Sequence, residues 1–306
     1  MAAYGENGYG KGGYGGGAEF VPRPGSARFF WQNRWSDQTL GSITASSSVA
    51  AFPVSNTQLK QRSKVWRSTT LGSQFVQRNL GAQFRIGGVA LVSHNLTVAG
   101  QFRVRISNEA DISAPLYDSD FIDAWEKTFD IESEFSDGTG KPTADGITLM
   151  PLVVRTVVFD EVYGQYIRID FLDSGNADNY IELAYVYAGI VTTIDPNMLY
   201  GWSIHRQDVA RVKSAASGQL WIDSLHRKYV AQSIFAGQPE SKAGGFWMHI
   251  FNLLGTSKEF VVSFRANEAP WRGFTTLYCR LANTPELINV AANAYSTSQL
   301  TFEEIP

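Results

Sequence analysis

The sequence has few residues that support metal, redox or disulfide chemistry. Among its 306 residues are one cysteine, Cys279, and four histidines. A single cysteine cannot form an intrachain disulfide, and within the apolar run TLYCRLA it is expected to be a buried, inert thiol. The histidines are scattered, and neither HExxH nor CxxC occurs, so the sequence gives no support for a zinc site.

An excess of basic charge and long apolar runs are also lacking. Lys and Arg number 26 against 29 Asp and Glu, a formal net charge of -3. Nucleic-acid binding depends on cationic side chains that neutralise phosphates, so we predict no nucleic-acid partner. No apolar run reaches the roughly 18 residues that a membrane helix needs, and we predict no membrane insertion.

Sequence motifs of catalysis are absent as well. Neither the nucleophile pattern G-x-S-x-G nor the phosphate loop G-x-x-x-x-G-K-[ST] occurs. The adjacent Glu303 and Glu304 would point to opposite faces of a strand and could not act on one bond. We therefore predict that the protein is not an enzyme. A hydrolase whose two carboxylates come from distant loops is the alternative.

What the sequence does contain is a strong β pattern. Six runs rich in β-branched and aromatic residues lie between residues 75 and 189, and FRVRIS alternates apolar residues with Arg103 and Arg105. Alternation at period two is typical of a half-buried antiparallel strand. The predicted fold class is mainly β, an antiparallel β-sandwich or jelly roll.

The second half of the chain mixes strand-like runs with one expected helix. Trp247, Ile250, Phe251 and Leu254 fall on one helical face, and Gly255 follows as a stop. We predict a β-rich α+β domain there. The predicted divisions are a Gly/Tyr-rich arm at 1–28, a jelly roll at 29–190 and the second domain at 191–306.

Three stretches carry a resemblance to a known fold family. These are KVWRSTTLGSQFVQRNLG, the run reaching SHNLT with FRVRIS after it, and YGQYIRIDFLD answered by YIELAYVYAG. Over roughly residues 50–190 the pattern resembles the galactose-binding-like (discoidin) jelly roll.

Together with the strand-rich second half and its acidic closing strand, this arrangement also resembles distal-tail-like proteins of the tail tip or baseplate of long-tailed bacteriophages. That resemblance implies a structural virion protein in the tail, made in the host cytoplasm. Its partners would be like subunits in a ring and other tail proteins. The alternative function is a carbohydrate-binding, receptor-recognition module that binds host surface glycan.

Two groups of residues are candidates for ligand binding in the first domain. Trp66, Arg67, His94 and Asn95 could form a glycan surface, because an aromatic face beside a planar cation suits sugars. In the other interpretation, Trp66 packs in the core and Asn95 forms hydrogen bonds with the backbone of its own loop. The loop from Asp118 to Asp137 holds eight carboxylates and one lysine.

Within that loop Asp118, Asp120 and Asp123 are candidate Ca²⁺ ligands, because calcium takes six to eight oxygens. The EF-hand spacing is absent, so a solvated or partner-facing acidic loop is the alternative. A partner facing this loop would present arginines.

The first 17 residues include eight glycines, with tyrosines at positions 4, 9 and 14. Ordering such a segment costs about 17–34 kcal/mol of backbone entropy, more than one protomer's surface usually repays. We expect Tyr4, Tyr9 and Tyr14 to lie on an adjacent subunit, although folding back or clamping by another complex is open. Trp271 and Arg272, in the polar context PWRGF, are further candidates for a subunit interface.

Overall fold

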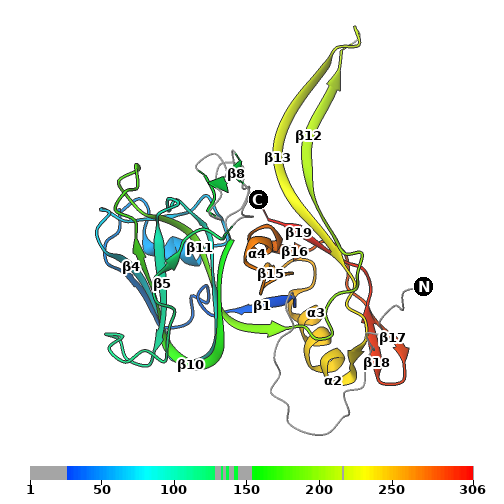
Figure 1. Cartoon of the computed structure of the whole chain (residues 1–306), viewed down its shortest axis with the longest axis horizontal. Coiled ribbons are helices and arrows are strands. Elements are labelled where there is room, and N and C mark those ends of the chain that lie inside the picture. Colours follow the sequence, from blue (N-terminus) through cyan, green and yellow to red (C-terminus); the bar gives the residue numbers. More distant parts are fainter. Residues whose placement is uncertain are drawn as a thin grey trace, which may run out of the picture.

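The computed structural model describes residues 26–127, 132–133, 136–137, 141–143, 154–215 and 217–305. They form two lobes joined by one continuous sheet (Figure 1). The strand pairings are antiparallel, and helices are few and short, so the predicted mainly β class is confirmed. Tyr4, Tyr9 and Tyr14 lie outside the described residues. Within the described part, no helix has the length and apolar character needed to cross a membrane.

The first lobe is built on two long, curved strands. β4 (Gln74–His94) pairs with β10 (Val154–Leu172), and β5 (Gln101–Ser107) and β11 (Glu182–Thr193) lie outside them in the sheet. Phe102, Val104 and Ile106 are fully buried, while Arg103 and Arg105 face outward, as the alternation predicts. The remaining elements are β2 (Ser42–Ala45), η1 (Val54–Gln58), β3 (Trp66–Arg67), β6 (Tyr117–Asp118), β7 (Ile122–Asp123), β8 (Glu132–Ser133) and β9 (Ser136–Asp137).

The second lobe packs a short helical segment against its strands. The helices are α2 (Glu240–Lys242), the π-helix η2 (Ala243–Trp247), α3 (Met248–Leu254) and α4 (Ala269–Thr275). Trp247, Ile250 and Leu254 are buried and α3 ends at Gly255, whose φ is +53°, so the expected helix is confirmed. The strands are β14 (Gln238–Pro239), β15 (Phe260–Ser263), β16 (Thr276–Leu281), β17 (Leu287–Ala291), β18 (Ala294–Thr297) and β19 (Leu300–Glu304). Cys279 is buried in this core as predicted.

One strand, β1 (Arg28–Asn33), connects the lobes. It pairs with β11 of the first lobe on one side and with β15 of the second on the other. Phe29 packs in the core of the second lobe, while Phe30 belongs to a buried cluster between the lobes. The predicted boundary between residues 28 and 29 falls inside β1, and the one between residues 190 and 191 falls inside β11.

A long hairpin projects from the second lobe (Figure 1). β12 (Ser203–Ser214) pairs with β13 (Leu220–Ser233) along its whole length, and only the base of β13, Val230–Ser233, pairs with β19. Most described side chains of β12 are exposed. The sequence predicts the two halves of β13 as separate strands and does not predict β12, because both faces of β12 are largely exposed and its apolar residues do not alternate regularly with polar ones.

Candidate functional site

The structure brings Arg67 and Asn95 together at the surface of the first lobe. The group, which we call the Arg67 cluster, consists of Phe52, Arg67, Asn95, Asp178, Tyr180 and Glu182. The Arg67 guanidinium lies 4.0 Å from the ring centre of Phe52 and 4.7 Å from that of Tyr180. Its Nε donates to Glu182 Oε2 at 2.6 Å. Held between two rings and a carboxylate, the guanidinium has a fixed orientation.

Asn95 connects the loops around this guanidinium. Its Nδ2 donates to Asp178 Oδ2 at 2.9 Å and to the Tyr180 carbonyl at 3.0 Å. Its Oδ1 accepts from the Glu182 amide at 2.7 Å. These bonds run to residues 178–182 and not to the loop of Asn95 itself, as one interpretation predicted, and they hold Tyr180 and Asp178 in place beside Arg67.

The other two residues predicted for a glycan surface do not reach it. Trp66 has no exposed surface and its Nε1 donates to the Ser47 carbonyl, so it is a core anchor and offers no ring face to a sugar. His94 packs edge-on against Trp125, with ring centres 5.4 Å apart. Desolvation by burial, together with the charge of Arg155, lowers the pKa of His94 to about 4. The predicted places of Trp66 and His94 on a glycan surface are corrected because each packs against a residue distant in the sequence.

The three predicted calcium ligands do not form a metal-binding group. The Asp118 carboxylate accepts hydrogen bonds from Nε and Nη2 of Arg103. This ion pair holds the pKa of the Asp118 carboxyl below its usual value. Asp120 is exposed, and the Asp123 backbone carbonyl accepts from Arg155. No cluster of three or more acidic, histidine or cysteine side chains suited to a metal occurs among the described residues.

A second polar group lies where the lobes meet. Glu126 accepts from Arg272 through both carboxylate oxygens, Nε to Oε1 at 2.6 Å and Nη2 to Oε2 at 2.7 Å. Arg155 also donates to Oε1. The Glu126 and Arg155 side chains are only 8% and 10% exposed, so this carboxylate connects the lobes away from bulk water. A charged pair in such a setting is stable only when its bonds are satisfied.

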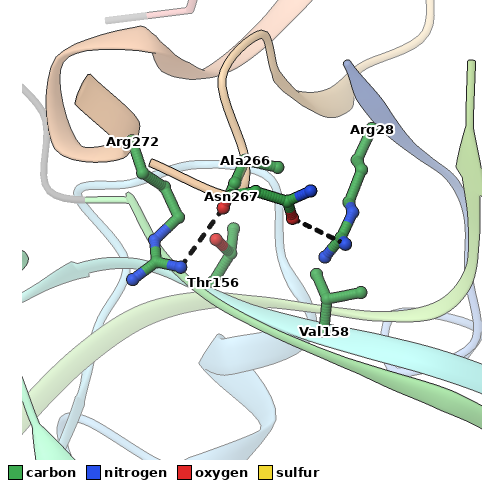
Figure 2. Close-up of a pocket in the computed structure, with 6 residues that line it drawn as sticks. All are labelled: Arg28, Thr156, Val158, Ala266, Asn267 and Arg272. Atoms are coloured by element: carbon green, nitrogen blue, oxygen red, sulfur yellow. Dashed lines mark hydrogen bonds between the residues drawn. The ribbon is translucent and has the colours of Figure 1, made fainter. Parts of the chain in front are cut away.

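Next to this group is a cavity of about 220 Å³ (Figure 2). The lining residues are Arg28 of β1, Thr156 and Val158 of β10, Ala266 and Asn267 before α4, and Arg272 of α4. Arg28 Nη2 donates to Asn267 Oδ1 at 2.8 Å, and Arg272 Nη1 to the Ala266 carbonyl at 3.2 Å. Among the described residues, the cavity is thus lined by two cations and no acidic side chain.

The predicted interface residues have different placements. Trp271 is 38% exposed, and the Arg265 guanidinium lies 4.6 Å from its ring centre. An interface role for Trp271 stays a prediction. Arg272 is engaged by Glu126 of the same chain, so its observed contact joins the two lobes and not two subunits.

Sequence reasoning did not select Phe52, Tyr180, Glu126 or Arg28. Tyr180 ends the turn-forming stretch DSGNADNY, and an aromatic residue in such a polar loop was an available signal. Arg28 and Glu126 lie nearly one hundred positions apart in the sequence. Only the pairing of β1 with both lobes brings the region of Arg28 to the region of Glu126.

No protein-family model matches the chain, and a comparison with curated proteins gave no match. Several solved structures are similar over about half of it. A chitosan-binding module of a chitosanase/glucanase from Paenibacillus sp. IK-5 has 18% identity and a TM-score of 0.33, over 51% of this chain and 98% of the module.

The family 32 carbohydrate-binding module of Clostridium perfringens NanJ, in complex with galactose, has 13% identity and a TM-score of 0.36, over 54% of this chain and 99% of that one. A fucose-binding module of Streptococcus pneumoniae has 14% identity and a TM-score of 0.35, over 52% of this chain and 94% of that one. We transfer no ligand and no residue role from them to this chain.

Proposed function

We propose that the protein binds carbohydrate through the Arg67 cluster. The observation that carries the proposal is the Arg67 guanidinium held between Phe52 and Tyr180 at a partly exposed surface. Sugars present apolar ring faces and hydroxyl groups, and aromatic rings with fixed charged groups bind both. Because Glu182 and Asn95 already order the cluster, little side-chain entropy would be lost on binding.

The test is a glycan array followed by calorimetry with the glycans retained. We expect Tyr180→Ala to weaken binding about tenfold or more, because it removes a ring face and frees the guanidinium. Arg85→Gln is the matched control, since Arg85 makes a similar exposed pair with Glu161 elsewhere on the lobe. An array with no retained glycan, or equal affinity in Tyr180→Ala, would contradict the proposal.

A second candidate function, structural assembly, is favoured by the tip of the β12–β13 hairpin. Val212, Leu220, Trp221 and Ile222 are 59–68% exposed there. Val212 faces Ile222 across the ladder and Lys213 faces Trp221, so both faces of the tip carry apolar side chains. Exposed apolar groups on a projecting element are typical of a contact with another chain.

We propose a second copy of the chain as the occupant, because the charges are complementary. Residues 203–233 contain five Lys and Arg against two Asp, whereas residues 118–137 contain eight carboxylates and one lysine. Asp118 and Glu126 of the acidic segment and Arg227 and Lys228 of the hairpin already pair within the chain, and the remaining charges are still of opposite sign. A hairpin of one copy that reaches the acidic segment of the next makes a head-to-tail contact, and such contacts form a ring when the rotation between copies closes. In this proposal the protein is a structural component of a phage tail tip, and neither proposed function includes a catalytic step.

Light scattering on the purified full chain tests the assembly. We expect a defined oligomer for the wild type and a shift to monomer for the double variant Trp221→Ser and Ile222→Ser. Val290→Ser is the control, because Val290 is similarly exposed but lies on β17. A monomeric wild type at high concentration argues against the ring. Mass spectrometry of purified phage particles tests the location in the virion.

A further inference from the structure

The cavity between the lobes has the chemistry of an anion site. We propose that it binds one small oxyanionic group, a phosphate, sulfate or carboxylate, between Arg28 and Arg272. The site lies at the junction of β1, β10 and α4, apart from the Arg67 cluster, and the inference does not depend on the proposed carbohydrate function (Figure 2).

The two arginines have donor capacity left for a ligand. Arg28 donates one side-chain hydrogen bond among the described residues, to Asn267, and its buried Nε has no partner there. A guanidinium carries five N–H donors in a planar fork that matches two oxygens of a carboxylate or phosphate. The hydroxyl of Thr156 and the amide of Asn267 supply further polar groups at the cavity wall.

Among the described residues, the positive charge at this junction is only partly compensated. Three arginines (Arg28, Arg155 and Arg272) meet near the junction, and Glu126 is the buried carboxylate that pairs with two of them. Asp123 acts on Arg155 but does not line the cavity, and Glu268 is paired with Arg265. Burial, and then the charge of Arg272, lower the pKa of Arg28. An anion between the two cations would offset both effects.

The size of the cavity sets the class of ligand. A cavity of about 220 Å³ has room for a small oxyanion and several water molecules. Arginine is the side chain best suited to pair with such oxyanions at a partly desolvated site.

Isothermal titration calorimetry on the full chain tests the site, with sulfate, phosphate and glucuronate as probes. Sulfate and phosphate stand for a free inorganic anion, and glucuronate for the carboxylate of a small organic acid. Chloride at matched ionic strength is the reference ligand. We expect at least one oxyanion to bind with one-to-one stoichiometry and chloride not to bind.

Arg28→Gln should weaken that binding about tenfold or more, because a charge-assisted hydrogen bond is lost. Arg28→Lys should have an intermediate effect, since the charge stays and the fork is lost. Thr156→Val, which preserves the shape of the side chain, should weaken binding a few-fold. Arg227→Gln is the control, because Arg227 is an exposed, ion-paired arginine of the hairpin.

Equal heats for the oxyanions and chloride, or wild-type affinity in Arg28→Gln, would overturn the proposal. If Arg28→Gln does not fold, Thr156→Val and Arg28→Lys decide the outcome by the same comparison. Binding that Arg227→Gln weakens as much as Arg28→Lys would also overturn it, because general surface charge would then be responsible.

Discussion

His94 is half-buried and packs against Trp125, and its imidazole is costly to protonate there. Its Nδ1 accepts from the Leu96 amide at 3.3 Å, and a hydrogen bond to the Ala124 backbone offsets only part of the cost of protonation. Desolvation is the largest cause that brings the pKa of His94 to about 4, below its ordinary 6.5. The unfolded chain therefore takes up this proton at a higher pH than the folded protein does.

This difference predicts acid destabilisation between pH 6.5 and 4. The unfolded state binds more protons throughout that range, so the free energy of unfolding falls as the pH falls, by a total of about 3 kcal/mol from this group. His94→Gln should remove that part of the pH dependence, and His205→Gln, at an exposed histidine, should not. Urea unfolding at several pH values measures it. A profile unchanged by His94→Gln would contradict the prediction.

For single residues, the sequence shows which side chains have the chemistry to bind a ligand, but it does not show which of them reach the surface. Arg67 and Asn95 lie in one group at the surface, and their role in ligand binding stays a prediction. Trp66 and His94 were placed wrongly on the ligand surface, because their burial is decided by residues distant in the chain, such as Phe171 and Trp125.

Among the elements, β1 depends on one close backbone approach. Its pairing with β11 shifts register between Phe30 and Gln32. At that place Gly189 of β11 lies so close that a Cβ atom would be 1.8 Å from the Gln32 carbonyl oxygen. A glycine is therefore required there, for lack of space.

Gly189→Ala should lower the free energy of unfolding by about 3 kcal/mol or more, because the backbone of β1 or β11 must move. Gly175→Ala is the matched control, since a Cβ at Gly175 meets nothing within 4 Å. Denaturant unfolding of both variants measures the difference. Equal stability of the two would show that β1 adapts without cost.

The local sequence pattern predicts a strand or a helix where one side of the element is buried and the other is exposed. The alternation in β5 and the helical face that ends at Gly255 are examples, because each has a buried and an exposed side. The pattern failed for β12, whose polar side chains have no buried face to mark a period. It also failed to show that β4 and β10 each run continuously for about twenty residues.

For the whole molecule, the shared strand makes the two lobes interdependent. The ring of Phe29 lies within about 6 Å of the ring centres of five aromatic residues in the second lobe: Phe235, Phe246, Trp247, Phe260 and Phe302. Its neighbour Phe30 is buried between the lobes. Neither core is complete without β1.

We therefore expect one cooperative unfolding transition for both lobes, and Phe29→Ala should lower its free energy by about 3–5 kcal/mol. Circular dichroism and tryptophan fluorescence should report the same midpoint in wild type and variant. Two separated transitions, or a loss confined to one probe, would show that the lobes unfold independently.

The division of the chain into parts stays a prediction from the change in composition along the chain. The strand that joins the parts could not be predicted, because residues 28–33 pair with residues 189–193 and 261–263. Nothing local in FFWQN distinguishes a strand with two distant partners from an ordinary edge strand.

The route of hydrogen-bonded strands from the hairpin has a mechanical consequence. It runs from β12 and β13 through β19, β16 and β15 to β1, and then into the first lobe. A pull on the hairpin tip would be carried strand by strand along that route to the distant lobe. The narrowest described links on that route are the ladders between β16 and β19 and between β1 and β15, three residue pairs each, and these would shear before the hairpin unzips from its own base.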